Sequence, residues 1–134
     1  MNKILNKIKY LVVFLVALAS AGVALAQRDV PSQNAPRERV QVRLADISVS
    51  ALSPEARSTL TLIDKGGPYP YDRDGIVFGN FEKRLPAKDR GYYQEFTVKT
   101  PGVNHRGARR IVAGKGGDKY YSDDHYKTFK RIVP

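Results

Sequence analysis

Apolar side chains in the second half of this 134-residue chain occur in short runs broken by polar residues. The runs are rich in β-branched and aromatic residues and are bounded by Gly, Pro, Asn or Asp, which is typical of strands separated by turns. The pattern predicts five strands, at residues 76–78, 92–99, 109–113, 119–122 and 128–132. Turns are expected at Gly66-Gly67, at Pro101-Gly102 and from Gly114 to Gly117.

A segment ahead of these strands has the spacing of a helix. The sequence Ser53-Pro54-Glu55 supplies a capping hydroxyl, a proline at the first helical position and an acid in the first turn. Ala56, Leu60 and Ile63 then follow at the i, i+4, i+7 spacing of one helical face. The pattern predicts a helix from Pro54 to about Asp64. Strands joined by short turns after it predict an α+β fold, with one N-terminal helix packed on a single antiparallel β-sheet.

The first 26 residues have the layout of a secretory signal peptide. Three lysines precede an uncharged run from Leu11 to Ala26 that ends in small side chains. This run is shorter than the roughly 20 apolar residues that span a bilayer, so cleavage after Ala26 is favoured over a membrane anchor. Residues 27–45 are polar and lack periodicity, which predicts a flexible leader. The folded domain is expected at 46–134, where Ile47 and Val49 begin to alternate with polar residues.

Charge and composition narrow the classes of function. The chain has a formal net charge of +10, and residues 27–134 keep +7, from 20 basic against 13 acidic side chains. The excess lies in the C-terminal half, with 13 basic and 5 acidic side chains from Lys83 to Pro134. Such a field attracts polyanions, nucleic acid above all, although a solvated basic surface has the same composition. The absence of cysteine excludes thiolate catalysis, and with two histidines in all, neither a metal nor a cofactor is predicted.

Four side chains form the candidate chemistry. Glu95 lies in an alternating strand pattern, on the face shared by Tyr93 and Thr97. Arg106 and Arg110 are four residues apart at the start of a strand, and paired guanidinium groups suit a phosphate. His125 lies in a turn before the last strand, where its imidazole can exchange protons near neutral pH. Each residue alone is ordinary on a protein surface. Together, in a small basic domain, they favour chemistry on a phosphodiester.

Six segments resemble, in order and spacing, those of the guanyl-specific bacterial ribonucleases, the barnase and streptomycete group. The segments are Ala51-Leu52-Ser53-Pro54-Glu55-Ala56, Gly67-Pro68-Tyr69-Pro70-Tyr71, Asp74-Gly75-Ile76-Val77-Phe78, Tyr92-Tyr93-Gln94-Glu95-Phe96-Thr97-Val98, Arg106-Gly107-Ala108-Arg109-Arg110 and Asp124-His125-Tyr126-Lys127-Thr128-Phe129. The resemblance covers about residues 46–133, and six motifs at matching spacing are far more specific than one.

The resemblance implies a role for each candidate residue. Glu95 would be the general base, His125 the general acid, and Arg106 and Arg110 the phosphate-binding pair. The remaining implied substrate contacts are those to guanine from the loop Phe78, Gly79, Asn80, Phe81 and Glu82, and that of Tyr126 beside the scissile phosphate. Gly79 and Phe81 depart from the family, since the streptomycete members are expected to carry larger polar residues there. The terminal cysteine pair of those members is also absent.

The implied activity is a secreted, monomeric endoribonuclease that cuts single-stranded RNA after guanosine through a 2′,3′-cyclic phosphate. An extracellular or periplasmic location follows from the signal peptide, with no membrane contact after cleavage. A barstar-like acidic inhibitor is the expected protein partner. Two alternatives stay open at the level of sequence: a secreted basic protein that binds RNA or another polyanion without cutting it, and an envelope-anchored or toxin-like form of the same enzyme.

Overall fold

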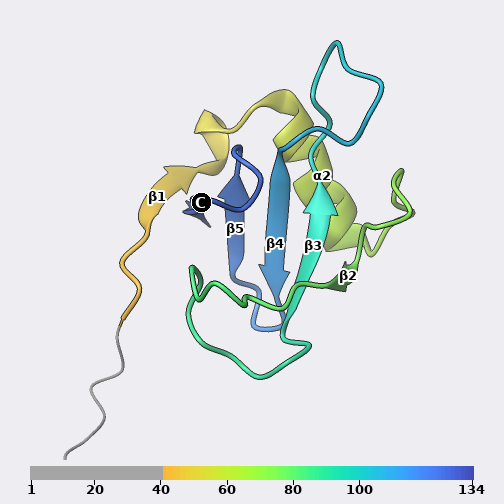
Figure 1. Ribbon diagram of the computed structural model, residues 1–134. Coiled ribbons are helices and arrows are strands. Elements are labelled where there is room, and N and C mark those ends of the chain that lie inside the picture. Colours follow the sequence, from red (N-terminus) through yellow and green to blue (C-terminus); the bar gives the residue numbers. More distant parts are fainter. Residues whose placement is uncertain (1–40) are drawn as a thin grey trace, which may run out of the picture. The chain divides into compact units, whose positions relative to one another are not determined.

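The computed structural model describes residues 41–134, which form one helix packed on a six-stranded sheet (Figure 1). In chain order the elements are β1 (Ala45–Ser48), η1 (Val49–Ala51), α2 (Pro54–Lys65), β2 (Ile76–Val77), β3 (Tyr93–Thr97), β4 (Arg110–Gly114), β5 (Lys119–Ser122) and β6 (Lys130–Val133). The predicted signal peptide and residues 27–40 of the predicted leader lie outside the described residues. Within 41–134 no helix is long and apolar enough to cross a membrane.

The helix α2 begins and ends where its local chemistry dictates. Ser53 is the N-cap, and its Oγ accepts a hydrogen bond from the backbone N–H of Ala56 at 3.2 Å. Gly66 adopts a left-handed φ of 79°, and its N–H and that of Gly67 bond to carbonyls of the last turn. The predicted helix is therefore confirmed, with its end one residue later, at Lys65.

The strand order in the sheet is β1-β6-β5-β4-β3-β2. The four pairs from β6 to β2 are antiparallel, and all five predicted strands are present with bounds shifted by two residues or fewer. The expectation of a wholly antiparallel sheet is wrong for one pair, because β1 runs parallel to β6. A helix and a long loop separate β1 from the next strand, so no tight hairpin sets its direction.

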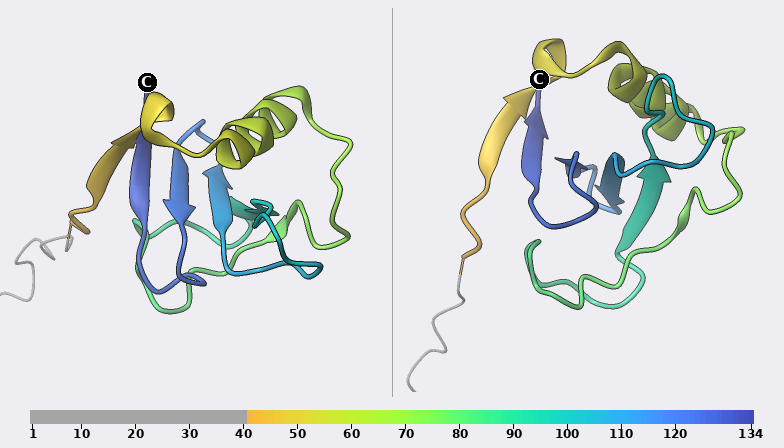
Figure 2. Two further views of the ribbon diagram at one scale, coloured as in Figure 1. Left: turned by 90° about the horizontal axis from the view of Figure 1, so that it is seen from above. Right: turned by 45° about the horizontal axis from the view of Figure 1, so that its top comes forward.

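The two faces of the sheet carry separate apolar cores. On one face, α2 packs against the central strands (Figure 2). This core consists of Leu52, Ala56, Leu60, Val98 and Ile111. The other face is covered by the loop that follows β2, and its core consists of Leu85, Tyr93, Val112, Tyr120 and Phe129. The side chains of Ile111 and Val112 point to opposite faces, as the two-residue repeat of a strand requires.

Strand register brings three polar side chains into one row on the face opposite the helix. Thr97 of β3 pairs with Arg110 of β4, and Arg110 pairs with Ser122 of β5. All three are buried, at 1–2% exposed. Directly paired residues share a face of the sheet, so this row provides a rigid base for the site.

Candidate active site

Glu95 lies in β3, between β2 and β4, and only 7% of the residue is exposed. Carboxylates are rarely buried unless they are paired, and both oxygens of Glu95 have partners. Arg106 Nη2 donates to Oε1 at 3.0 Å, and the Tyr126 hydroxyl donates to Oε2 at 2.8 Å. The structure therefore places Glu95 on the protected face with a fixed orientation, and not on a solvent-facing sheet surface.

Arg110 joins this arrangement through Tyr126. It is the first residue of β4, and its Nε donates to the Tyr126 hydroxyl oxygen at 3.0 Å. Its Nη1 donates to the carbonyl of Arg109 at 2.8 Å, which fixes the plane of the guanidinium group. Burial raises the pKa of Tyr126, and its hydrogen bond to Glu95 raises the pKa further. The phenol thus stays protonated at neutral pH and donates to the carboxylate.

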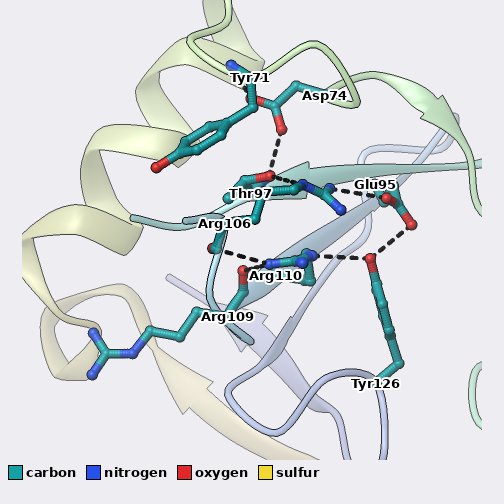
Figure 3. A network of polar contacts seen from close by, with 8 residues as sticks. All are labelled: Tyr71, Asp74, Glu95, Thr97, Arg106, Arg109, Arg110 and Tyr126. Carbon is teal, nitrogen blue, oxygen red and sulfur yellow. Dashed lines mark hydrogen bonds and ion pairs between the residues drawn. The ribbon is translucent and has the colours of Figure 1, made fainter. Parts of the chain in front are cut away.

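Thr97 completes a polar network that also contains Glu95, Arg106, Arg110 and Tyr126 (Figure 3). Its Oγ1 accepts from Arg106 Nε at 2.9 Å, so the guanidinium group is held at two atoms. Its backbone N–H donates to Asp74 Oδ1 at 2.7 Å. The sequence alone predicts no role for Thr97, although its position two residues after Glu95, on the same strand face, is consistent with one.

His125 lies in the turn between β5 and β6 and is exposed, as the sequence predicts. Its backbone N–H donates to the carbonyl of Ala108 at 3.1 Å, in the segment between the two site arginines. Its ring centroid is 5.1 Å from that of Tyr126, whose hydroxyl contacts Glu95. The imidazole and the carboxylate therefore both adjoin the Tyr126 side chain, the imidazole beside its ring and the carboxylate at its hydroxyl.

A cavity of about 290 Å³ adjoins the polar network. Its lining includes Glu95 and Tyr126 together with all five residues of the segment Phe78–Glu82, here called the base loop. It does not include Arg106, Arg110 or His125, which adjoin it through Glu95 and Tyr126. The ring of Phe78 stacks on Tyr126 at 5.3 Å and forms an aromatic wall.

The base loop is held mainly by one asparagine. Asn80 has a left-handed φ of 51°, and its amide side chain both accepts from and donates to the backbone of Leu85, at 3.0 and 2.9 Å. Glu82 is exposed and forms an ion pair with Arg84 at 2.7 Å, a contact that the sequence pattern does not predict. Asn80 and Glu82 both line the cavity, so the loop that Asn80 holds forms part of its wall.

The two departures from the expected loop sequence are linked in space. A Cβ atom at Gly79 would collide with the ring of Phe81, which lies against that glycine. Phe81 is 86% exposed and lines the cavity. The small residue at 79 is therefore what permits the aromatic ring at 81 to lie in its observed place.

This chain resembles known ribonucleases in sequence and in fold. Residues 35–133 match the family described as ribonuclease. The guanyl-specific ribonuclease St of Saccharopolyspora erythraea is 57% identical over 93 residues, which are 69% of this chain and 87% of that protein. The guanyl-specific ribonuclease Sa of Kitasatospora aureofaciens is 52% identical over 87 residues, which are 64% of this chain and 91% of that protein.

Among solved structures, that of ribonuclease Sa2 with mononucleotides superposes with a TM-score of 0.69 at 56% identity, over 70% of this chain and 98% of that one. A second structure holds the same ribonuclease with guanosine-2′-cyclophosphate, at a TM-score of 0.66. The fold, the site and the extent of the match lead to one conclusion: this chain belongs to the guanyl-specific microbial ribonuclease family.

Proposed function

We propose that this protein is an endoribonuclease that cleaves single-stranded RNA on the 3′ side of guanosine, by transphosphorylation followed by hydrolysis. The observation that carries the proposal is Glu95, a buried carboxylate that Arg106 and Tyr126 orient on the wall of the cavity. Support also comes from the relatives, which are named guanyl-specific ribonucleases, and from the cyclic guanosine phosphate bound to ribonuclease Sa2.

In the first step Glu95 accepts the proton of the ribose 2′-hydroxyl. Each carboxylate oxygen has two lone pairs, so a proton can be accepted although both oxygens already receive hydrogen bonds. The 2′-oxygen attacks the adjacent phosphorus in line, and the bond from phosphorus to the 5′-oxygen breaks. His125, as imidazolium, protonates the departing 5′-oxygen, which leaves a 2′,3′-cyclic phosphate.

In the second step the two residues exchange roles. Neutral His125 takes a proton from water and the water oxygen attacks phosphorus. The bond from phosphorus to the 2′-oxygen breaks, and protonated Glu95 returns its proton to that oxygen, which leaves a 3′-phosphate. Arg106 and Arg110 stabilise the charge that develops on the non-bridging oxygens in both steps. Arg106 uses two of its five N–H groups within residues 41–134, and the others are available to the phosphate. DNA lacks the 2′-hydroxyl and is not expected to be cleaved.

Guanine is expected in the cavity formed by the base loop. Backbone N–H groups of Phe78–Glu82 would donate to O6, and the Glu82 carboxylate would accept from N1 and the exocyclic amine. Adenine offers the reverse pattern at these positions, with an amine in place of O6 and no proton on N1. The loop would therefore discriminate guanine by hydrogen bonding and not by size.

The decisive experiment uses purified residues 27–134 and an end-labelled RNA of known sequence in EDTA. Cuts on the 3′ side of guanosine, with ends that carry a cyclic phosphate, are the expected result. A protein that binds the RNA and leaves it intact would instead be the basic binding protein considered from the sequence. Since base and acid act in opposite protonation states, the rate should be bell-shaped in pH.

We further propose that the chain is exported, cleaved after Ala26, and released as a monomer without membrane contact. The support is the signal-like sequence of residues 1–26. Sequencing the N-terminus of protein recovered from medium and periplasm tests this, and a mature chain that starts at Met1 would contradict it.

A barstar-like acidic inhibitor is the proposed partner, because an acidic surface would complement the basic site. Size-exclusion chromatography of the protein alone tests whether it is a monomer. The same measurement with a candidate inhibitor tests whether the two form a complex.

A further inference from the structure

The turn that carries His125 has an unusual backbone. His125 and Tyr126 both have a positive φ, of 58° and 68°. Residues with a Cβ atom rarely adopt this left-handed conformation, because it brings the Cβ atom too close to the backbone. Two consecutive left-handed residues therefore need neighbouring contacts to hold them. Both residues belong to the proposed reaction site, and the placement of their side chains depends on this backbone.

Three side chains around the turn supply those contacts. Asp124 accepts hydrogen bonds from Ser122 Oγ at 2.9 Å, from the Thr128 N–H at 2.9 Å and from Thr128 Oγ1 at 2.6 Å. Ser122 Oγ in turn accepts from the backbone N–H of Tyr126 at 3.0 Å. Asp124 therefore ties together both ends of the segment that contains the left-handed pair.

This cluster is anchored to the sheet. Ser122 is 1% exposed and pairs in register with Arg110, in the same buried row as Thr97. Burial alone would raise the pKa of Asp124, but hydrogen bonds from Thr128 and Ser122 lower it to about 2, so this acceptor is ionised at neutral pH. The ionised carboxylate gives its three hydrogen bonds the strength of charge-assisted contacts.

We propose that Ser122, Asp124 and Thr128 form a clamp of positioning residues that sets the imidazole of His125 and the hydroxyl of Tyr126 for reaction. The clamp residues touch neither substrate nor the reacting atoms; they act through the backbone of the turn. The inference rests on the proposed function for its catalytic consequence, whereas the geometry of the turn can be measured without activity.

The experiment compares Thr128→Val, which removes the hydroxyl at nearly constant shape, with Thr128→Ser, which keeps it. Thr128→Val should lower kcat on the dinucleotide GpC about tenfold, because small misplacements of a proton-transfer group are costly. Its KM, and the Kd of guanosine 3′-monophosphate, should stay within about twofold. Thr128→Ser should restore kcat. Asp124→Asn should lower kcat further. If Asp124→Asn does not fold, the comparison of Thr128→Val with Thr128→Ser tests the proposal.

Two readouts separate positioning from plain loss of stability. The pH profile of kcat should move in Thr128→Val and not in Leu60→Ala, a helix-face core variant that lowers the melting temperature without touching the turn. Nuclear Overhauser contacts between the rings of His125 and Tyr126 should weaken in Thr128→Val only. The proposal is overturned if Thr128→Val keeps the kcat, pH profile and ring contacts of the parent protein, or if Thr128→Ser loses as much as Thr128→Val. Should the parent protein fail to cleave RNA, the proposed function fails and the ring contacts alone decide whether the clamp exists.

Discussion

The two ends of the active-site cavity are built differently. At one end, Glu95 and the adjoining Arg110 are 7% and 2% exposed, and every member of the polar network has a hydrogen-bond partner within the network. At the other end, Phe81 is 86% exposed and the Glu82 side chain 73% exposed, on a loop whose main tie is Asn80. Proton transfer needs geometry set before the substrate arrives, whereas base recognition can use loop backbone that the substrate itself orders.

The largest effect is expected at the two proposed proton-transfer residues, Glu95 and His125. Glu95→Gln keeps the shape and removes the proton acceptor, so kcat/KM on GpC should fall by about two to four decades. His125→Ala should give a loss in the same range through the acid step. Steady-state kinetics measure both, with Gln94→Ala on the exposed face of the same strand as the matched control. Activity within about tenfold of the parent protein in either variant would remove that residue from the mechanism.

Discrimination between bases should change most with Glu82→Ala. A hydrogen bond to a charged group contributes about 1.5–3 kcal/mol, which is roughly a factor of 10 to 150. The ratio of kcat/KM for GpC to that for ApC should fall by this factor, while the rate on ApC is nearly unchanged. Lys83→Ala, an exposed neighbour outside the cavity lining, is the control. An unchanged ratio would place guanine recognition elsewhere.

Thr97→Val tests whether the polar network contributes to catalysis independently of base recognition. The variant removes the acceptor of Arg106 Nε but keeps the backbone bond to Asp74, because that bond uses the N–H of residue 97. Loss of one charge-assisted bond should reduce kcat/KM about tenfold on GpC and on ApC alike. Thr97→Ser, which keeps the hydroxyl, should recover most of the rate. A loss confined to GpC would contradict the assignment of Thr97 to the phosphate end.

The sequence predicts the parts of this molecule that depend on local rules. The helix follows from the cap at Ser53 and the stop at Gly66, and the strands follow from alternation between turns. The direction of β1 does not follow, because it depends on pairing with a strand 85 residues away. The spacing of apolar, capping and turn residues therefore predicts the fold class, but it does not predict the complete strand topology.

The site shows the same division. Alternation puts Glu95 on one strand face, but the pattern gives no sign that Arg106 and Tyr126 occupy both of its oxygens. The roles of the site residues come from the resemblance of whole motifs to a family. The spacing of residues does not predict the left-handed backbone of His125 or the contact of Phe81 with Gly79, because each depends on packing in the folded protein.

Phe81 should contribute to nucleotide binding by stacking. Aromatic rings that stack on a base contribute about 1–3 kcal/mol, and the low end suits a ring at an open rim. Phe81→Ala should therefore weaken binding of guanosine 3′-monophosphate about fivefold, with kcat unchanged. The chain has no tryptophan, so Phe81→Trp provides a single fluorescent reporter that bound nucleotide should quench. Equal Kd values for the parent protein and Phe81→Ala would exclude stacking at this position.

The smallest effect is expected for Arg84→Ala. Arg84 holds Glu82 through an exposed ion pair, and such pairs contribute about 0–1 kcal/mol. Guanine would have to compete with Arg84 for the carboxylate, so removing the arginine should tighten binding of guanosine 3′-monophosphate by about threefold or less. Isothermal titration calorimetry at low and high salt measures this, and the difference should shrink as salt screens the pair. A loss of affinity above about tenfold would mean that Arg84 orients Glu82 for the base, and that the base end is as preorganised as the phosphate end.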